Sequence, residues 1–195
     1  MILSIVGYGD PVLRKVGEDI TKDYPNLQEL IANMYETMYG AYGVGLAAPQ
    51  IGLPIRLFVV DAAPFAEMEG NTEEEIAFLT TFKKTFINAK ILKEEGEEWA
   101  FNEGCLSIPE VHEPVKRKSK IQIEYYDENF VKHIDEFDGL AARVIQHEYD
   151  HIEGVLFTDK VSVLKKKLIS KKLNNILEGK IFTDYKMKLN KKKGR

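Results

Sequence analysis

The chain has 195 residues but only one cysteine, one tryptophan and four histidines. A single thiol cannot form an internal disulfide, which excludes the disulfide-stabilised secreted class and is typical of a reducing compartment. No apolar run approaches the roughly eighteen residues that a membrane-spanning helix requires. Residues 1–7 form a short apolar run without a basic start, so we expect no signal or transit peptide. These absences predict a cytoplasmic protein that has no membrane partner.

The overall composition is that of an ordinary folded protein, with 44% hydrophobic and 30% charged residues. This balance excludes a disordered chain, and the length fits one domain with a sizeable core. Charge is unevenly spread, however. Residues 160–195 carry 13 Lys and Arg and two acidic residues, a net +11, which leaves −15 on residues 1–159. We therefore predict one domain over residues 1–179 and a basic extension over residues 180–195. The basic end has two explanations, a polyanionic partner or a solubilising frayed terminus.

The most informative motif is His-Glu-Tyr-Asp-His at residues 147–151. Two histidines four residues apart on a helix share one face, with Cβ atoms about 5–6 Å apart, so both rings can bind one metal ion. Asp138 as a cap and Gly154 as a left-handed stop frame this segment as a helix. The alternative is a pair of packed core histidines. The helical frame and the intervening glutamate, Glu148, favour the metal site.

A third metal ligand has to come from elsewhere in the chain. Cys105 is the only thiol, and it lies within Glu103-Gly-Cys-Leu-Ser107. The alternative for an isolated cysteine is a small buried hydrophobic residue. Cys105 is therefore the only thiol candidate for the third ligand.

The expected elements alternate between helices and short strands. Apolar spacing predicts helices over residues 24–40 and 163–178, the second amphipathic with Leu164 and Leu168 facing inward. We predict strands at 55–61 and 86–93, a hairpin from 121–126 and 131–137, loops or turns at 43–50 and 94–98, and an acidic insertion at 62–82. This order predicts an α+β fold, with antiparallel strands packed around a central metal-binding helix and a C-terminal amphipathic helix.

Three blocks together resemble the peptide deformylase family of bacteria, which removes the formyl group from new protein N-termini. The blocks are Gly43-Val-Gly-Leu-Ala-Ala-Pro-Gln50, Glu103-Gly-Cys-Leu-Ser107 and Gln146-His-Glu-Tyr-Asp-His151. The resemblance implies a metal held by Cys105, His147 and His151, with water in the fourth position. It implies Fe²⁺ as the natural metal, with Zn²⁺, Ni²⁺ or Co²⁺ possible in purified protein.

The resemblance also implies roles for residues around the metal. Glu148 would move the proton of the attacking water to the leaving amine, and Gln50 and the backbone N–H of Leu106 would stabilise the oxyanion. An unbranched apolar slot would bind methionine, with candidates Val44, Phe101, Leu140 and Val144; plain core packing is the alternative for Leu140 and Val144. Gly45 would let the substrate backbone approach like an added strand, or is simply a turn glycine. We expect Glu103 to order its loop and Arg143 to form a salt bridge, with Glu103 as the candidate partner.

The sequence departs from the family pattern at His112, where many members carry arginine. We expect His112 and His133 to be ordinary surface residues. Two rival functions remain: a metallopeptidase, since His-Glu-x-x-His is common there, and a non-enzymatic module that binds ribosomes through the basic helix and tail. The implied partners are nascent formyl-methionine peptides and the ribosome.

Overall fold

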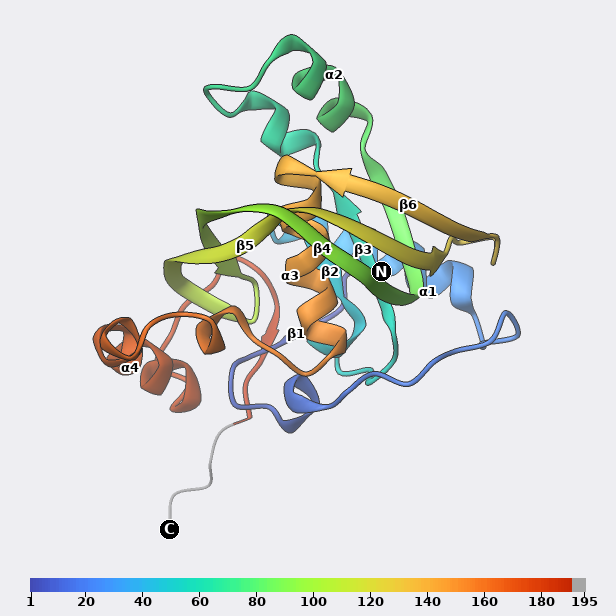
Figure 1. Cartoon of the computed structure of the whole chain (residues 1–195). Coiled ribbons are helices and arrows are strands. Elements are labelled where there is room, and N and C mark those ends of the chain that lie inside the picture. The colour runs from blue at the N-terminus through green and yellow to red at the C-terminus, as the bar shows by residue number, and fades with distance from the viewer. Residues whose placement is uncertain (191–195) are drawn as a thin grey trace.

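The computed structural model describes residues 1–190 and combines helices with sheet, as predicted. Figure 1 shows the course of the chain. The helices are α1 (Leu27–Gly40), α2 (Glu73–Thr81), α3 (Gly139–Ile152) and α4 (Val163–Leu177). The strands are β1 (Ile5–Val6), β2 (Gly45–Ala47), β3 (Leu57–Asp61), β4 (Lys83–Cys105), β5 (Ile108–Tyr126), β6 (Lys132–Asp138) and β7 (Met187–Lys188).

Five antiparallel strands form the main sheet, in the order β2-β3-β4-β5-β6. The register of β4 against β5 shifts at several places, including between Glu95 and Glu98. Such bulges bend a strand and increase its twist. The long β4–β5 pair therefore curves, and α3 lies within the curve in contact with β2, β3, β5 and β6 (Figure 1).

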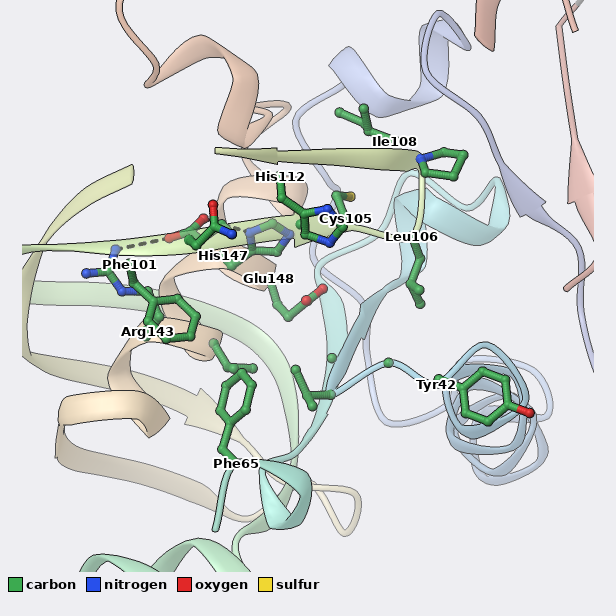
Figure 2. A pocket seen from close by; sticks show the side chains of 18 of the residues that line it. Tyr42, Phe65, Phe101, Cys105, Leu106, Ile108, His112, Arg143, His147 and Glu148 are labelled. Carbon is green, nitrogen blue, oxygen red and sulfur yellow. Dashed lines mark hydrogen bonds and ion pairs between the residues drawn. The ribbon is translucent and has the colours of Figure 1, made fainter. Parts of the chain in front are cut away.

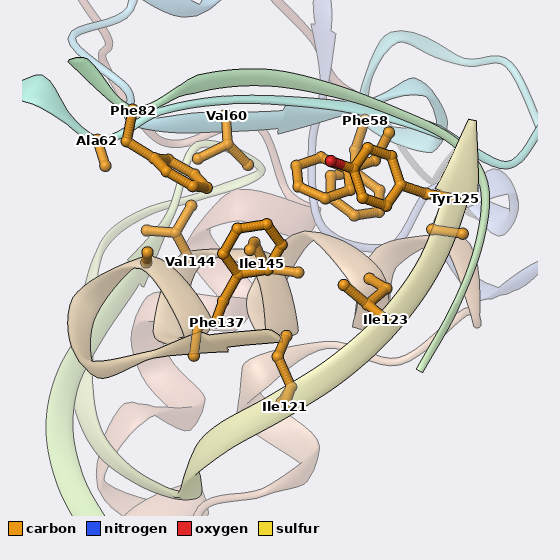
Figure 3. Packing of buried hydrophobic residues seen from close by; sticks show 14 of the residues in the cluster. Phe58, Val60, Ala62, Phe82, Ile121, Ile123, Tyr125, Phe137, Val144 and Ile145 are labelled. Atoms are coloured by element: carbon orange, nitrogen blue, oxygen red, sulfur yellow. The ribbon is translucent and has the colours of Figure 1, made fainter. Parts of the chain in front are cut away.

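The main core lies between α3 and this sheet. Figure 3 shows Val144 and Ile145 of α3 facing Phe58 and Val60 of β3 and Phe137 of β6. Ile145 and Phe58 are fully buried, and side chains of this size each contribute about 1.5–3 kcal/mol of transfer free energy on burial. This packing fixes the face that α3 turns toward the sheet and, with it, the direction of the helix's other side chains.

Two segments that were expected to be loops or turns contain strand residues. The predicted loop at 43–50 contains β2, which pairs with β3, and a short 3-10 helix at Ala48–Ile51. The predicted turn at 94–98 lies inside β4, where its glutamates lie on an exposed stretch of the strand and Gly96 takes a positive φ of 80°. The run of glutamates at 94–98 therefore indicates solvent exposure and not a turn, because pairing with β5 keeps this stretch in the strand. The helix at 24–40, the strand at 55–61, the hairpin at 121–137 and the left-handed Gly154 are confirmed.

The inward face predicted for the last helix is wrong at two positions. Leu164 is 69% exposed and Leu168 is 72% exposed, whereas Ile169 and Ile176 are buried. Helix α4 lies at one side of the molecule and packs mainly on β5, so only a narrow stripe of it is covered (Figure 1). The apolar spacing correctly predicts a helix. The width of its buried stripe depends on β5, a neighbour that the periodicity of the helix does not reveal.

The extension predicted at residues 180–195 is described up to residue 190. Over this part it folds back, and β7 pairs in parallel with β1 near the N-terminus. Over the described residues no helix has the length and apolar character needed to cross a membrane.

Candidate active site

Cys105, His147 and His151 come together at the end of β4 and on one face of α3. Each offers one ligand atom, and these atoms all lie within 4.8 Å of one another. Cys105 Sγ lies 3.3 Å from His151 Nε2. The four-residue spacing of the histidines and the packing of α3 against the sheet produce this arrangement, because the covered face of the helix sets where the two rings point.

A buried ionic network orients the His147 ring. Its Nδ1 lies 2.9 Å from a carboxylate oxygen of Glu103, which also accepts hydrogen bonds from Arg117 and Arg143. Burial opposes ionisation of Glu103, but the bonds from Arg117 and His147 outweigh it and hold its pKa well below the usual range. A carboxylate on one ring nitrogen fixes the tautomer and leaves Nε2 for a metal. The expected role of Glu103 in ordering its loop and the salt bridge from Arg143 both agree with these contacts.

The second histidine is held in the form that a metal requires. Burial lowers the pKa of His151 well below its ordinary value. A neutral imidazole keeps a lone pair on one nitrogen, as ligation demands. Its Nδ1 is buried without a hydrogen-bond partner among residues 1–190. One thiol and two imidazoles are a donor set that suits Zn²⁺ or Fe²⁺ in a site with an open position, so the residues present fit a metal.

Glu148 lies beside the cluster with an unusual environment. Burial raises its pKa to about 7, and its Oε2 has no hydrogen-bond partner in the described part of the chain. The carboxylate fits only because residue 45 is glycine: a Cβ on Gly45 would lie 2.4 Å from Glu148 Oε1. Gly45 is therefore not a turn glycine but a position in β2 that leaves space for the carboxylate of Glu148.

Gln50 is fixed with its amide group aimed at the cluster. Its Oε1 accepts a hydrogen bond of 2.8 Å from the Ala47 backbone N–H. This leaves Nε2 to donate toward Cys105 Sγ at 3.5 Å and Ser107 Oγ at 3.4 Å. Because the carbonyl end is occupied, the donor end faces the site.

These groups line a cavity of about 490 Å³. Figure 2 shows Cys105, His147 and Glu148 close together, with Phe65 and Tyr42 set apart from them. Of the predicted residues, those that line the cavity are Val44, Gly45, Gln50, Phe101, Cys105, Leu106, Val144, His147 and Glu148. Leu140 does not line it and packs in the main core instead, and His151 lies buried behind the wall.

Sequence reasoning missed several cavity residues from distant segments. They are Tyr42, Phe65, Met68, Ile108, His112 and Tyr185. Phe65 and Met68 belong to the acidic insertion, where two apolar residues among carboxylates were the only available signal. His112 is exposed but lies at the cavity and against Gly104, so it is more than an ordinary surface residue. His133, by contrast, lies in the β5–β6 hairpin and pairs with Asp127.

Comparison with known proteins decides the family. The model described as polypeptide deformylase matches residues 2–167. This chain belongs to the peptide deformylase family. It is 72% identical over 193 residues to the peptide deformylase of Flavobacterium psychrophilum, covering 99% of this chain and all of the relative. It is 70% identical over 196 residues to that of Flavobacterium johnsoniae, covering the whole of both chains.

Solved peptide deformylases share the fold. The crystal structure of the enzyme from Legionella pneumophila is 35% identical, with a TM-score of 0.76 over 90% of this chain and 95% of that one. The enzyme from Thermotoga maritima is 40% identical, with a TM-score of 0.71 over 83% of this chain and 99% of that one. Peptide deformylases are metal-dependent hydrolases of protein biosynthesis that remove the N-formyl group from nascent polypeptides. The prediction of family, activity and enzyme class is confirmed, and the metallopeptidase and the non-enzymatic module are set aside.

Proposed function

We propose that this peptide deformylase releases formate from formyl-methionine peptides at the cavity described above, with Cys105, His147 and His151 as ligands of Fe²⁺. The observation that carries the proposal is the convergence of the ligand atoms of these three side chains within 4.8 Å, beside a cavity that Cys105 and His147 line together with Glu148 and Gln50. Zn²⁺, Ni²⁺ or Co²⁺ would also suit this donor set in purified protein. We assign the chemistry to a catalytic domain of residues 1–179, acting in the cytoplasm where formylated chains emerge.

The bound metal would supply a Lewis acid that lowers the pKa of a coordinated water toward neutrality. The chain's own residues provide the rest of the chemistry. Glu148 accepts the proton of the attacking water and delivers it to the departing amine nitrogen. A pKa of about 7 suits both transfers, because the group can hold or release a proton near neutral pH.

The oxyanion that forms on attack needs hydrogen-bond donors. The Nε2 of Gln50 is oriented by its bond to Ala47, and the backbone N–H of Leu106 follows the ligand cysteine. Donors fixed before the reaction stabilise developing charge without reorganisation. We therefore assign Gln50 and Leu106 as the oxyanion donors.

The substrate chain has a place beside β2. Within residues 1–190 this strand is at the edge of the main sheet and pairs only with β3, so its other side can accept an extended peptide. Val44, Gly45, Phe101 and Val144 line the cavity next to it and offer an apolar slot for methionine. Phe65 packs edge-on against Phe101 at 5.9 Å and extends this wall.

The substrate assignment is tested by comparing formyl-Met-Ala-Ser with Met-Ala-Ser. We expect formate release from the first peptide and no cleavage of either peptide bond. Cleavage of the unformylated peptide at a similar rate would contradict the assignment and identify a peptidase. The assay needs no variant, so it reads the activity of the full chain directly.

Replacing Gln50 with alanine should lower kcat/KM by roughly 10²–10³, the usual effect of losing one oxyanion donor. The loss should fall on kcat, since the interaction strengthens only as charge develops. Steady-state kinetics on a formyl-Met peptide measures it. Gln122→Ala is the control, because that amide binds Glu136 at the surface. A rise in KM with unchanged kcat would make Gln50 a ground-state binding residue instead.

We also propose that the basic α4 helps the enzyme meet nascent chains at the ribosome. Ribosomal RNA is polyanionic, and each lysine that pairs with a phosphate releases a counterion, so binding should weaken steeply with salt. Lys167 and Lys171 are exposed on α4, close to the exposed Leu164 and Leu168. Lys191–Lys193, which we also expected to contribute, lie outside the described residues.

Charge reversal at Lys167 and Lys171 to glutamate should reduce co-sedimentation with ribosomes several-fold at low salt and leave turnover of a short formyl peptide unchanged. This variant is preferred to removal of residues 180–195, because the removal would also delete β7. Lys22→Glu with Lys90→Glu makes the same charge change at exposed positions on the body and serves as the control. Equal sedimentation of both variants across a salt series would contradict α4 docking.

A further inference from the structure

In the turn between β4 and β5, the carbonyl groups of both central residues accept hydrogen bonds from residues outside the turn. Cys105 pairs with Ile108, so Leu106 and Ser107 are the two central residues of this turn. The hydroxyl of Tyr185 donates a hydrogen bond of 2.7 Å to the Leu106 carbonyl. The Tyr8 backbone N–H donates one of 2.8 Å to the Ser107 carbonyl. The turn that follows the ligand cysteine is thus fixed by two distant segments.

The two segments that hold the turn also hold each other. Tyr8 follows β1 and Tyr185 precedes β7, and these strands pair in parallel. Gly7 N–H donates to the Lys188 carbonyl at 3.0 Å. A Cβ on Gly7 would lie 2.5 Å from Leu189, so the chains approach closely here. The C-terminal segment is therefore built into the body beside the site, although it lies beyond residues 2–167, which match the family model.

Tyr185 reaches the cavity itself as well as the turn. It lines the cavity and, like Leu106, packs against the core cluster around α1. The Leu106 side chain has a close neighbour of its own, because a Cβ on Gly43 would lie 2.8 Å from Leu106 Cδ1. Leu106 is therefore held at its side chain by packing near Gly43 and at its carbonyl by the Tyr185 hydroxyl. Such a hold fixes the peptide plane that follows Leu106, and through it limits how far the adjoining peptide, which carries the Leu106 N–H, can turn.

We propose that Tyr185 is a positioning residue for deformylation, which fixes the Leu106 backbone so that its N–H points at the developing oxyanion. This inference rests on the oxyanion role proposed above for Leu106. It assigns to the C-terminal segment a part in the reaction that its basic composition does not indicate. A donor must lie within about 0.5 Å of its productive position to act fully, and an outer hydrogen bond supplies that accuracy.

Tyr185→Phe tests the proposal, because it removes the hydroxyl and keeps the ring in the cavity wall. Loss of an outer-shell partner commonly lowers activity about 10–100-fold, so we expect kcat to fall about tenfold with KM within about twofold of the parent. Metal content and thermal unfolding should match the parent. Tyr125→Phe is the matched control: its hydroxyl donates a bond of the same 2.7 Å length to Asp135, away from the cavity.

A double variant separates positioning from a general structural effect. If Tyr185 and Gln50 support the same oxyanion, Tyr185→Phe should have a smaller effect on kcat in the Gln50→Ala background than in the parent. Unchanged kcat in Tyr185→Phe would overturn the proposal, as would a loss of kcat that follows a proportional loss of metal. Failure of the proposed function would appear elsewhere, as undiminished turnover in Glu148→Gln, so the two failures are distinguishable.

Discussion

Glu148→Gln should keep its metal and lose at least ~10² in kcat, the scale expected for loss of a general base. The variant replaces a proton carrier by an amide of almost the same size. The side chain is buried, and Gly45 leaves just enough space for it, so a near-isosteric change should preserve the fold of the site. Steady-state kinetics and elemental analysis of one preparation measure both quantities.

The matched control for this variant is Glu153→Gln. Glu153 caps the same helix but pairs with Arg56 outside the cavity, so its loss should affect stability and not turnover. If Glu148→Gln retained metal and its kcat stayed within a few-fold of the parent, Glu148 would not be the proton carrier. Because Glu148 lies on α3 and Glu153 caps its end, the expected contrast between them shows that the position of the carboxylate in the cavity, and not its charge alone, matters for turnover.

Cys105→Ser should lose the metal, or hold it far more weakly, and lose deformylation with it. Serine has a similar size, but an alkoxide forms much less readily than a thiolate, so the variant lacks the anionic ligand. Elemental analysis of protein prepared anaerobically is the measurement. The pattern should be opposite to that of Glu148→Gln, which loses turnover while the metal stays.

A full complement of metal in Cys105→Ser, with unchanged affinity, would mean that the third ligand lies elsewhere. Within residues 1–190, two other carboxylates around the cluster are committed to other partners. Glu103 binds Arg117, Arg143 and His147, and Asp150 binds Arg117. Glu103 and Asp150 are therefore poor substitutes for the missing thiolate.

The residues proposed for the chemistry could be predicted from sequence because they lie in short local motifs. His147 and His151 are placed by helical spacing alone, and Glu148 follows from its position between them. Cys105 required one further step, the pairing of the only thiol with the two histidines. The contacts that orient them were less visible: a salt bridge from Arg143 to Glu103 was expected, but Arg117 was not.

The walls of the cavity could be predicted only in part, since long-range packing builds them. Phe65 comes from the acidic insertion and Tyr185 from the basic C-terminal segment, and composition labels both regions as solvent-exposed. Leu140 was expected in the cavity because it shares the spacing of His147, yet it turns toward the core. A helical residue one or two turns away can face a neighbouring element, and the sequence does not specify where that boundary falls.

The fold shows the same division between local and distant information. Periodicity identified α1, β3 and α4, but local charge at 94–98 was misread as a turn because its pairing partner, β5, is remote in sequence. The outward leucines of α4 have the same cause, since the extent of its covered face depends on β5. Local patterns identified the elements, and the contacts between elements determined which faces are buried.

The most direct test of the proposed metal site measures metal content and formate release on the same anaerobic preparation of the full chain, before and after chelation and after Fe²⁺ is restored. We predict about one metal ion per chain, loss of both metal and formate release on chelation, and recovery of both in proportion. Formate release at the parent rate from metal-free protein would contradict the assignment of Cys105, His147 and His151 as the ligands of a catalytic metal.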